Sequence, residues 1–124
     1  GKINTATTIA QAEVSQLNCL GISGIEQYFP QTNPWTYIYT VNPTILNPDT
    51  RNPVTSCINP ALTKGGPSPN SMPPQGLGVT VPYTVKIDFW NNTNSISTPV
   101  INAEIEVSWQ YMGNHVIVMN DLIS

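Results

Sequence analysis

The chain has 124 residues, the length of a single domain, and a formal net charge of −3. Only four residues are Lys or Arg, which excludes the basic footprint that nucleic-acid binding requires. Charged residues make up 9% of the sequence, against about 25% in average soluble proteins, so the surface must be solvated largely by Asn, Thr and Ser. That composition is common outside the cytoplasm, and we expect an extracellular or cell-surface location for this single domain, 1–124.

The first segment has a helical pattern. Over residues 5–21 apolar and small side chains recur at spacings of three and four, which places them on one face of a helix. Gly21 is the predicted stop of this helix. Ser23 and Glu26 then form a capping-box pattern that predicts a second, short helix over 23–29. The residues of the apolar face are Ile3, Ala6, Ala10, Val14, Leu17 and Gly21.

A first strand is predicted over 35–41, where aromatic and β-branched residues alternate with polar ones. From residue 42 to residue 78 the chain is punctuated by Asn-Pro, Gly-Pro and Pro-Pro pairs. Each proline biases the residue before it away from helix. We therefore predict a long Pro-rich loop, which at this length has a function of its own or wraps around the body of the domain.

The last part of the chain predicts an antiparallel meander with strands over 79–89, 101–111 and 115–119. Odd-numbered residues are apolar and even-numbered residues are polar in the first two strands, the pattern of a sheet with one buried face. Gly113-Asn114 predicts a two-residue hairpin turn. Residues 116–118 are all apolar, so we expect this strand to be covered on both faces.

Only the N-terminal helix is available to cover the apolar face of that meander. The predicted fold is therefore α+β, with an amphipathic helix packed on a small antiparallel sheet. No apolar run approaches the roughly 20 residues of a spanning helix, so we expect no membrane segment in this chain. Whether an N-terminal anchor has been removed is open at this point.

The two cysteines, Cys19 and Cys57, lie in no metal-binding spacing. In an exported protein they predict one disulfide, which would contribute on the order of 3–4 kcal/mol, against the alternative of two unpaired thiols. Cys19 projects opposite the apolar face of the helix. Either the loop crosses the outer side of the helix, or the helix ends before residue 19.

Residues that could carry chemistry are few, and each has a simpler structural interpretation. His115, the single histidine, follows the predicted turn without a second His or an arranged acid. Glu104 and Glu106 share a strand face, where paired carboxylates are usually solvated. Glu13 lies near the edge of the helical stripe, and we expect it to reach solvent or pair with Lys86.

No phosphate loop, dinucleotide fingerprint, nucleophile elbow or zinc motif is present in the sequence. We therefore expect no enzyme activity and no cofactor. The aromatic residues Trp35, Tyr37 and Trp90 are candidate platforms for stacking on a sugar, although core or rim packing is the simpler interpretation. Asn91-Asn92-Thr93 is a glycosylation sequon, with Asn91 as its acceptor.

The order of a helix, a long connection and a meander resembles type IV pilin-like domains, and in particular the soluble domains of TadE-like minor pilins. The resemblance rests on the helix that contains Ile3-Asn4-Thr5-Ala6-Thr7-Thr8-Ile9-Ala10-Gln11-Ala12-Glu13 and on β segments such as Ile105-Glu106-Val107-Ser108-Trp109. It implies a non-enzymatic subunit or minor component of a cell-surface filament, with other filament subunits as partners and no cofactor.

Two alternatives remain open on the sequence. One is an adhesin-like module that binds glycan or a surface protein through residues 42–78 and Trp90. The other is an all-β filament subunit in which residues 1–9 form an extended donor strand inserted into a neighbour.

Overall fold

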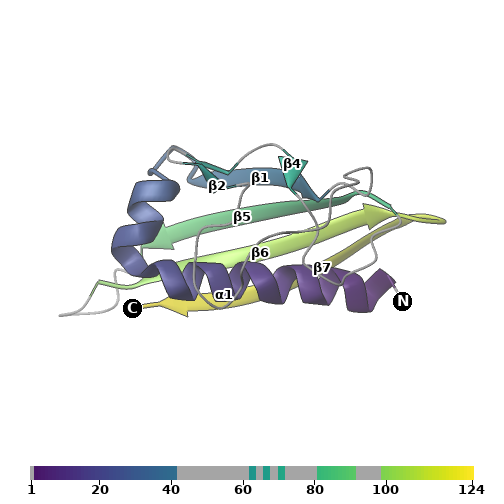
Figure 1. Ribbon diagram of the computed structural model, residues 1–124, viewed down its shortest axis with the longest axis horizontal. Coiled ribbons are helices and arrows are strands. Elements are labelled where there is room, and N and C mark those ends of the chain that lie inside the picture. The colour runs from purple at the N-terminus through teal and green to yellow at the C-terminus, as the bar shows by residue number, and fades with distance from the viewer. Residues whose placement is uncertain (1, 42–61, 64–65, 68–69, 72–80, 92–98) are drawn as a thin grey trace.

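The computed structural model describes residues 2–41, 62–63, 66–67, 70–71, 81–91 and 99–124. It confirms the α+β class, with one N-terminal helical segment and four antiparallel strands (Figure 1). Most of the predicted loop 42–78, and Cys57 within it, lies outside the described residues. The elements are α1 (Lys2–Tyr28), β1 (Thr36–Val41), β2 (Leu62–Thr63), β3 (Gly66–Pro67), β4 (Asn70–Ser71), β5 (Tyr83–Asn91), β6 (Ile101–Gln110) and β7 (Asn114–Ile123).

The main sheet has the strand order β4-β1-β5-β6-β7, in which β1, β5, β6 and β7 are antiparallel and the two-residue β4 is parallel to β1. The register places Val85 opposite Val107 and Val107 opposite Ile117. Odd residues of β6, and those of β5 from Tyr83 to Phe89, are buried, because the period-two alternation turns them to one face. β5 begins only at Tyr83, after Pro82, which has no N–H group to donate to a neighbouring strand.

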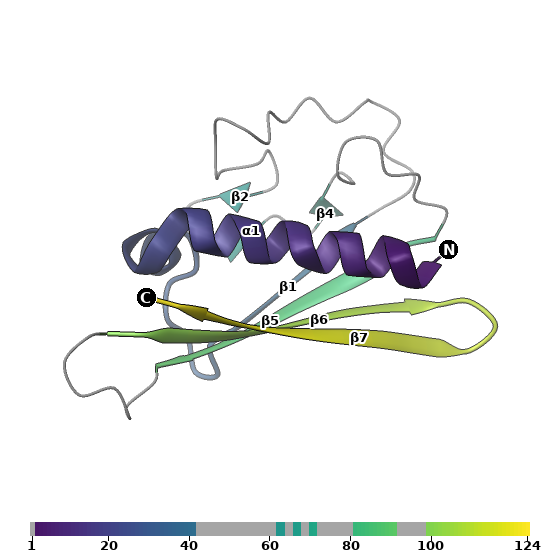
Figure 2. The ribbon, with the colours of Figure 1, turned by 90° about the horizontal axis from the view of Figure 1, so that it is seen from below.

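The helix α1 lies along β6 and β7 and covers the odd-residue face of the sheet (Figure 2). Ala6, Ala10 and Leu17 are fully buried against it. Gly21 takes φ 68° and ψ −176°, so the helix bends there and continues to Tyr28 in a second segment. Residues 2–9 are helical, which overturns the alternative of an extended N-terminal donor strand.

An aromatic cluster fixes the reversal of the chain from α1 into β1. The indole Nε1 of Trp35 donates to the carbonyl oxygen of Phe29 at 2.8 Å, and the Tyr37 hydroxyl donates to the carbonyl oxygen of Pro30 at 2.6 Å. The ring of Phe89 lies 5.2 Å from that of Phe29 and 5.0 Å from that of Trp35. These contacts extend the core beneath α1 to the end of the sheet, because Phe29, Trp35 and Phe89 belong to the same hydrophobic cluster as the residues under α1.

The hairpin between β6 and β7 differs from the predicted two-residue turn. Its loop is Tyr111-Met112-Gly113, and Asn114 is already the first residue of β7, paired with Gln110. Met112 and Gly113 adopt φ values of 51° and 122°, so the second positive φ falls on Met112 and not on Asn114. Tyr111 consequently leaves the buried face and is half exposed.

The strand β7 is also exposed on one face, which contradicts the predicted cover on both faces. Val116, Val118 and Leu122 are 53%, 49% and 57% exposed. Odd residues Ile117 and Met119 pack partly against the core beneath α1. One helix can cover only one face of a sheet, so Val116, Val118 and Leu122, the apolar even residues of β7, stay exposed on the other face.

Candidate functional site

The face of the sheet opposite α1, here called the open face, carries exposed side chains that are available for contact with another molecule. Even residues of β1, β5, β6 and β7 point to it, since successive side chains on a strand alternate between faces. Its centre is polar and its two margins are apolar. The open face consists of Ile38 on β1, Lys86 and Asp88 on β5, Glu104 and Glu106 on β6, and Val116, Val118 and Leu122 on β7.

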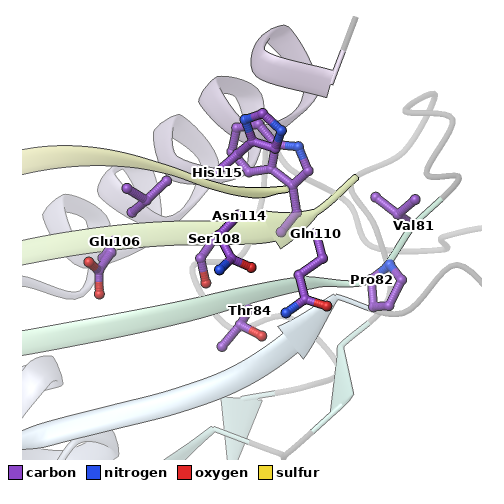
Figure 3. Close-up of a pocket in the computed structure, with 10 residues that line it drawn as sticks. Val81, Pro82, Thr84, Glu106, Ser108, Gln110, Asn114 and His115 are labelled. Atoms are coloured by element: carbon purple, nitrogen blue, oxygen red, sulfur yellow. The ribbon is translucent and has the colours of Figure 1, made fainter. Parts of the chain in front are cut away.

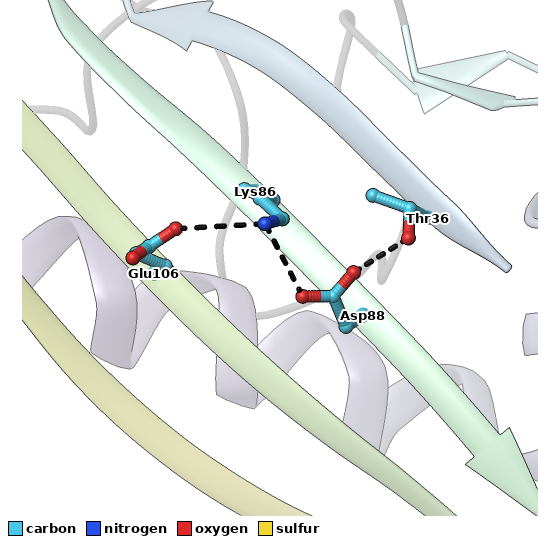
Figure 4. A network of polar contacts seen from close by, with 4 residues as sticks. All are labelled: Thr36, Lys86, Asp88 and Glu106. Carbon is cyan, nitrogen blue, oxygen red and sulfur yellow. Dashed lines mark hydrogen bonds and ion pairs between the residues drawn. The ribbon is translucent and has the colours of Figure 1, made fainter. Parts of the chain in front are cut away.

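A small polar network occupies the centre of the open face (Figure 4). The Thr36 hydroxyl donates to Oδ1 of Asp88 at 2.5 Å. The Lys86 ammonium nitrogen lies 3.7 Å from Oδ2 of Asp88 and 4.0 Å from Oε2 of Glu106. Glu104 lies directly opposite Asp88 in the register, so one lysine faces three carboxylates. The centre therefore carries a formal charge of −2, and its partly exposed ion pairs each contribute about 0.2–1 kcal/mol.

This geometry favours a solvated face over an acid/base pair. Glu106 lies toward Lys86 on β5, while Glu104 lies two residues earlier on β6, opposite Asp88. Acid/base catalysis by two carboxylates needs environments that differ enough to protonate one and ionise the other. Both glutamates here are partly exposed on the same open surface, so the pair has no such difference in environment.

The apolar margins of the open face belong to different strands. A row across the sheet runs from Ile38 on β1 through Lys86 and Glu106 to Val118 on β7. Ile38 is 57% exposed, as much as the β7 residues. β7 is an edge strand, because no other strand in the described part of the chain pairs with its outer side. The β7 margin thus combines exposed apolar side chains with an unpaired strand edge.

An open depression of about 680 Å³ lies at the hairpin end of the sheet (Figure 3). Thr84, Ser108, Gln110 and Asn114 line it, with His115 at its rim. The ring of His115 stacks on Trp109 at 5.2 Å, and its Nε2 lies 2.8 Å from the Tyr111 carbonyl oxygen, where it donates. This histidine therefore closes the hairpin, which is the structural interpretation that the sequence favoured.

The described residues contain no cluster of three His, Cys, Asp or Glu side chains that could hold a metal ion.

The three aromatic residues considered for sugar stacking do not form a common surface. Trp35 is buried, with 6% of its surface exposed, and Tyr37 is half-buried against Phe29. Trp35 is therefore a core residue and offers no ring face to a ligand. Trp90, at the end of β5, is 46% exposed and remains available. Asn91 beside it is exposed, and the other two residues of its sequon lie outside the described residues.

Glu13 departs from its predicted position at solvent or beside Lys86. It is 4% exposed on α1 and accepts a hydrogen bond of 2.5 Å from the Tyr39 hydroxyl. Lys86 points to the opposite face of the sheet, where its partners are Asp88 and Glu106. The spacing of three from Ala10 and four to Leu17 places Glu13 inside the buried stripe, and that spacing was the available signal.

Cys19 lies on the exposed side of α1, as the helical spacing predicts, and it is not a free thiol. Cys57 lies outside the described residues, so the Cys19–Cys57 pairing stays a prediction. Across the described ranges, no helix combines the length and the apolar character needed to span a membrane. No family model, curated protein or solved structure matches this chain.

Proposed function

We propose that this protein is a non-enzymatic, pilin-like subunit or minor component of a cell-surface filament, and that it acts by packing against other chains. The observation that carries the proposal is the outer surface of α1. Between Lys2 and Glu26 the helix contains a single charged residue, Glu13, and that residue is buried. The exposed side is formed by small or uncharged residues, including Ile3, Asn4, Thr8, Ala12 and Ser15.

A helix exposed to water normally carries Lys and Glu on its polar face. A helix without surface charge can be covered by a neighbour without the cost of removing ions from water. Small residues such as Ala12 and Ser15 also allow close approach of a second helix. The outer surface of α1 is thus suited to helix-to-helix contact between subunits, which is how a pilin-like domain enters a filament.

The test uses the protein in the cells that make it, located by an antibody against residues 1–124. We expect the protein in filaments sheared from the cell surface. A Ser15→Cys variant, on the outer side of α1, should give disulfide-linked dimers in those filaments, because one added thiol can join two chains. Thr84→Cys is the matched control, because Thr84 is equally polar and exposed but lies on the opposite side of the molecule. Recovery of a free protein with no linked dimers from either variant would refute the proposal.

An adhesin-like binding module is the second candidate, and one observation favours it. Trp90 exposes 46% of its surface at the end of β5, on the same face as the polar network. An exposed indole can stack on a sugar ring or on an apolar side chain of a partner. A glycan array probed with the wild-type domain and with Trp90→Ala separates the candidates, because only the adhesin predicts a signal that the substitution abolishes.

A further inference from the structure

We propose that β7 pairs edge to edge with β7 of a second copy of this chain, about a two-fold axis, with Val118 opposite Val118 of the second copy. The two sheets then join into one continuous antiparallel sheet. This proposal does not rest on the proposed function. A two-fold contact is closed, and so it joins chains in pairs without polymerising them. In a filament, it would therefore connect subunits of two neighbouring filaments.

The outer edge of β7 has the regularity that strand pairing needs. On its inner side all ten residues, from Asn114 to Ile123, pair with β6 in one uninterrupted register. Edge strands of soluble proteins are commonly protected by Lys, Pro, bulges or short length. β7 contains no Lys and no Pro, and Asp121 is its only acidic residue. The opposite edge of the sheet is formed by β4, which has only two residues.

The side chains on the open face of β7 favour an apolar neighbour. Val116, Val118 and Leu122 each expose about half of their surface or more to solvent. A second strand placed beside β7 would cover the sides of these residues, and the Val118 pair at the two-fold axis is a β-branched cross-strand pair, which stabilises an antiparallel sheet by about 0.2–1 kcal/mol. The edge therefore offers backbone hydrogen bonds and apolar contact along the same strand.

The register follows from the symmetry. Paired residues of antiparallel strands point to the same face, so odd residues must pair with odd residues and even with even. Two registers align the strand almost completely. One is centred on Val118 and pairs residues 114–122 with each other, and the second is centred on Met119 and pairs residues 115–123.

Charge complementarity selects the register centred on Val118. It places His115 opposite Asp121 of the second copy, and the symmetry repeats this pair at the other end of the contact. Asp121 is partly exposed, so the accessible part of its carboxylate can be reached from a neighbouring strand. Nδ1 of His115 is the ring nitrogen that can donate to it, because Nε2 is held by the Tyr111 carbonyl oxygen of its own chain. The register centred on Met119 would instead place Asp121 against Ile117.

The position of α1 explains why a second copy fits this edge. α1 lies over β6 and β7, and neighbouring strands of a sheet lie about 4.8 Å apart. The two-fold axis would therefore place the axes of the two α1 helices about 10 Å from each other, which is the usual distance between packed helices. Thr5 hydrogen-bonds to Tyr83, so its flank of the helix faces β5. By helical spacing the flank above β7 carries Ile3, Thr7 and Val14, which are all uncharged.

Oxidative cross-linking of single-cysteine additions tests the register. Opposed residues of antiparallel strands have Cα atoms about 4.5–5.5 Å apart, within the range of a disulfide. Val118→Cys should give a disulfide-linked dimer on non-reducing gels, several-fold more than Val116→Cys, which is equally exposed but lies opposite Asn120. Wild-type protein controls for the native cysteines. Equal cross-linking of the two variants, or preferential cross-linking of Met119→Cys, would overturn the proposal.

A second measurement needs no cysteine. Val118→Lys places two ammonium groups against each other at the two-fold axis, while within one chain the lysine faces Glu106, so folding is preserved. Sedimentation of the wild type should show a concentration-dependent dimer that this variant loses by at least tenfold in affinity. Thr84→Lys adds the same charge on a central strand and should keep the dimer. A wild type that stays monomeric at millimolar concentration, or binds only an unrelated chain, contradicts the proposal.

Discussion

The Tyr39 hydroxyl donates a hydrogen bond of 2.5 Å to Oε1 of Glu13, and this bond connects β1 to the middle of α1 across the core. Tyr39 is 9% exposed and Glu13 is 4% exposed, so both groups have left bulk water. A buried carboxylate is stable only where donors replace its hydration. The bond thus fixes where α1 lies along the sheet, whereas apolar contacts alone would allow small shifts.

We predict that Tyr39→Phe lowers the free energy of unfolding by about 1–3 kcal/mol, because it removes a donor from a buried carboxylate. Urea denaturation monitored by tryptophan fluorescence measures the loss. Tyr28→Phe is the matched control: Tyr28 is half-buried and its hydroxyl has no hydrogen-bond partner among the described residues, so its removal should change stability by less than about 0.5 kcal/mol. Equal effects of the two substitutions would show that the Glu13 bond contributes nothing specific.

At the bend of α1, we predict that Gly21→Asn is as damaging as Gly21→Ala, each costing about 1–3 kcal/mol. Asparagine often replaces glycine in the left-handed helical region, but φ 68° with ψ −176° lies in a region that only glycine occupies readily. An added Cβ meets no atom within 4 Å, so the cost is conformational and not steric crowding. Thermal or urea unfolding measures both variants, and a tolerated Asn would mean that the bend has ordinary left-handed geometry.

We predict that the free energy of unfolding decreases as the pH rises above about 10. Tyrosines that are equally exposed in the folded and unfolded states would cause no such decrease. Burial raises the pKa of Tyr37, and it raises the pKa of Tyr83 against the opposing hydrogen bond from Thr5. The unfolded chain therefore loses these protons at a lower pH than the folded protein does. Between the unfolded-state and folded-state pKa values, the free energy of unfolding falls by at most about 1.4 kcal/mol per pH unit for each tyrosine.

Urea midpoints between pH 8 and pH 11 check this dependence on pH. Tyr83→Phe should flatten the decline above pH 10 while leaving the slope below pH 9 unchanged. An identical decline in the wild type and in this variant would exclude Tyr83 as a source of the effect.

For the polar network, we predict that Lys86→Ala costs at most about 1 kcal/mol and that most of this cost disappears at 1 M salt. The lysine is 42% exposed at its side chain, so its ion pairs to Asp88 and Glu106 are weak. Removing it also leaves three acidic side chains facing one another, and salt screens their repulsion. Denaturation at two salt concentrations measures the difference, with Thr84→Ala on the same strand as the salt-insensitive control.

The strands with one buried face could be predicted from sequence, because the alternation of apolar and polar residues in β5 and β6 is a local property that does not depend on the rest of the fold. Val85, Ile87, Ile105 and Val107 are all fully buried, as their odd positions required. The hairpin was predicted incorrectly because a positive φ at Met112 depends on how the two strands align. The prediction that β7 is covered on both faces was wrong for a related reason. The apolar residues of a strand do not reveal how many other elements are available to cover its two faces.

The candidate surface was less predictable than the fold. A polar residue near the edge of an apolar helical stripe, such as Glu13, can either be solvated or be buried in a hydrogen bond. The hydrogen-bond partner that decides between these two positions, Tyr39, lies 26 residues away in the sequence. The open margin of β7 also depends on strand order, because an edge strand and a central strand can have the same sequence pattern. The sequence could not decide whether Trp35 is a core residue or a binding platform. The structure decides this, because its indole N–H donates a hydrogen bond to the buried carbonyl oxygen of Phe29.

The packing of α1 on β6 and β7 has a consequence for synthesis of the chain. α1 leaves the ribosome before β6 and β7, the strands on which it rests, and these follow it by roughly a hundred residues. Such long-range contacts slow folding, because loop closure precedes the stabilising contacts. Until β7 emerges, the apolar stripe of α1 has no surface to cover it. The nascent chain is therefore prone to aggregation in the interval between the emergence of α1 and that of β7, and any chaperone that assists it in this interval should recognise this helix.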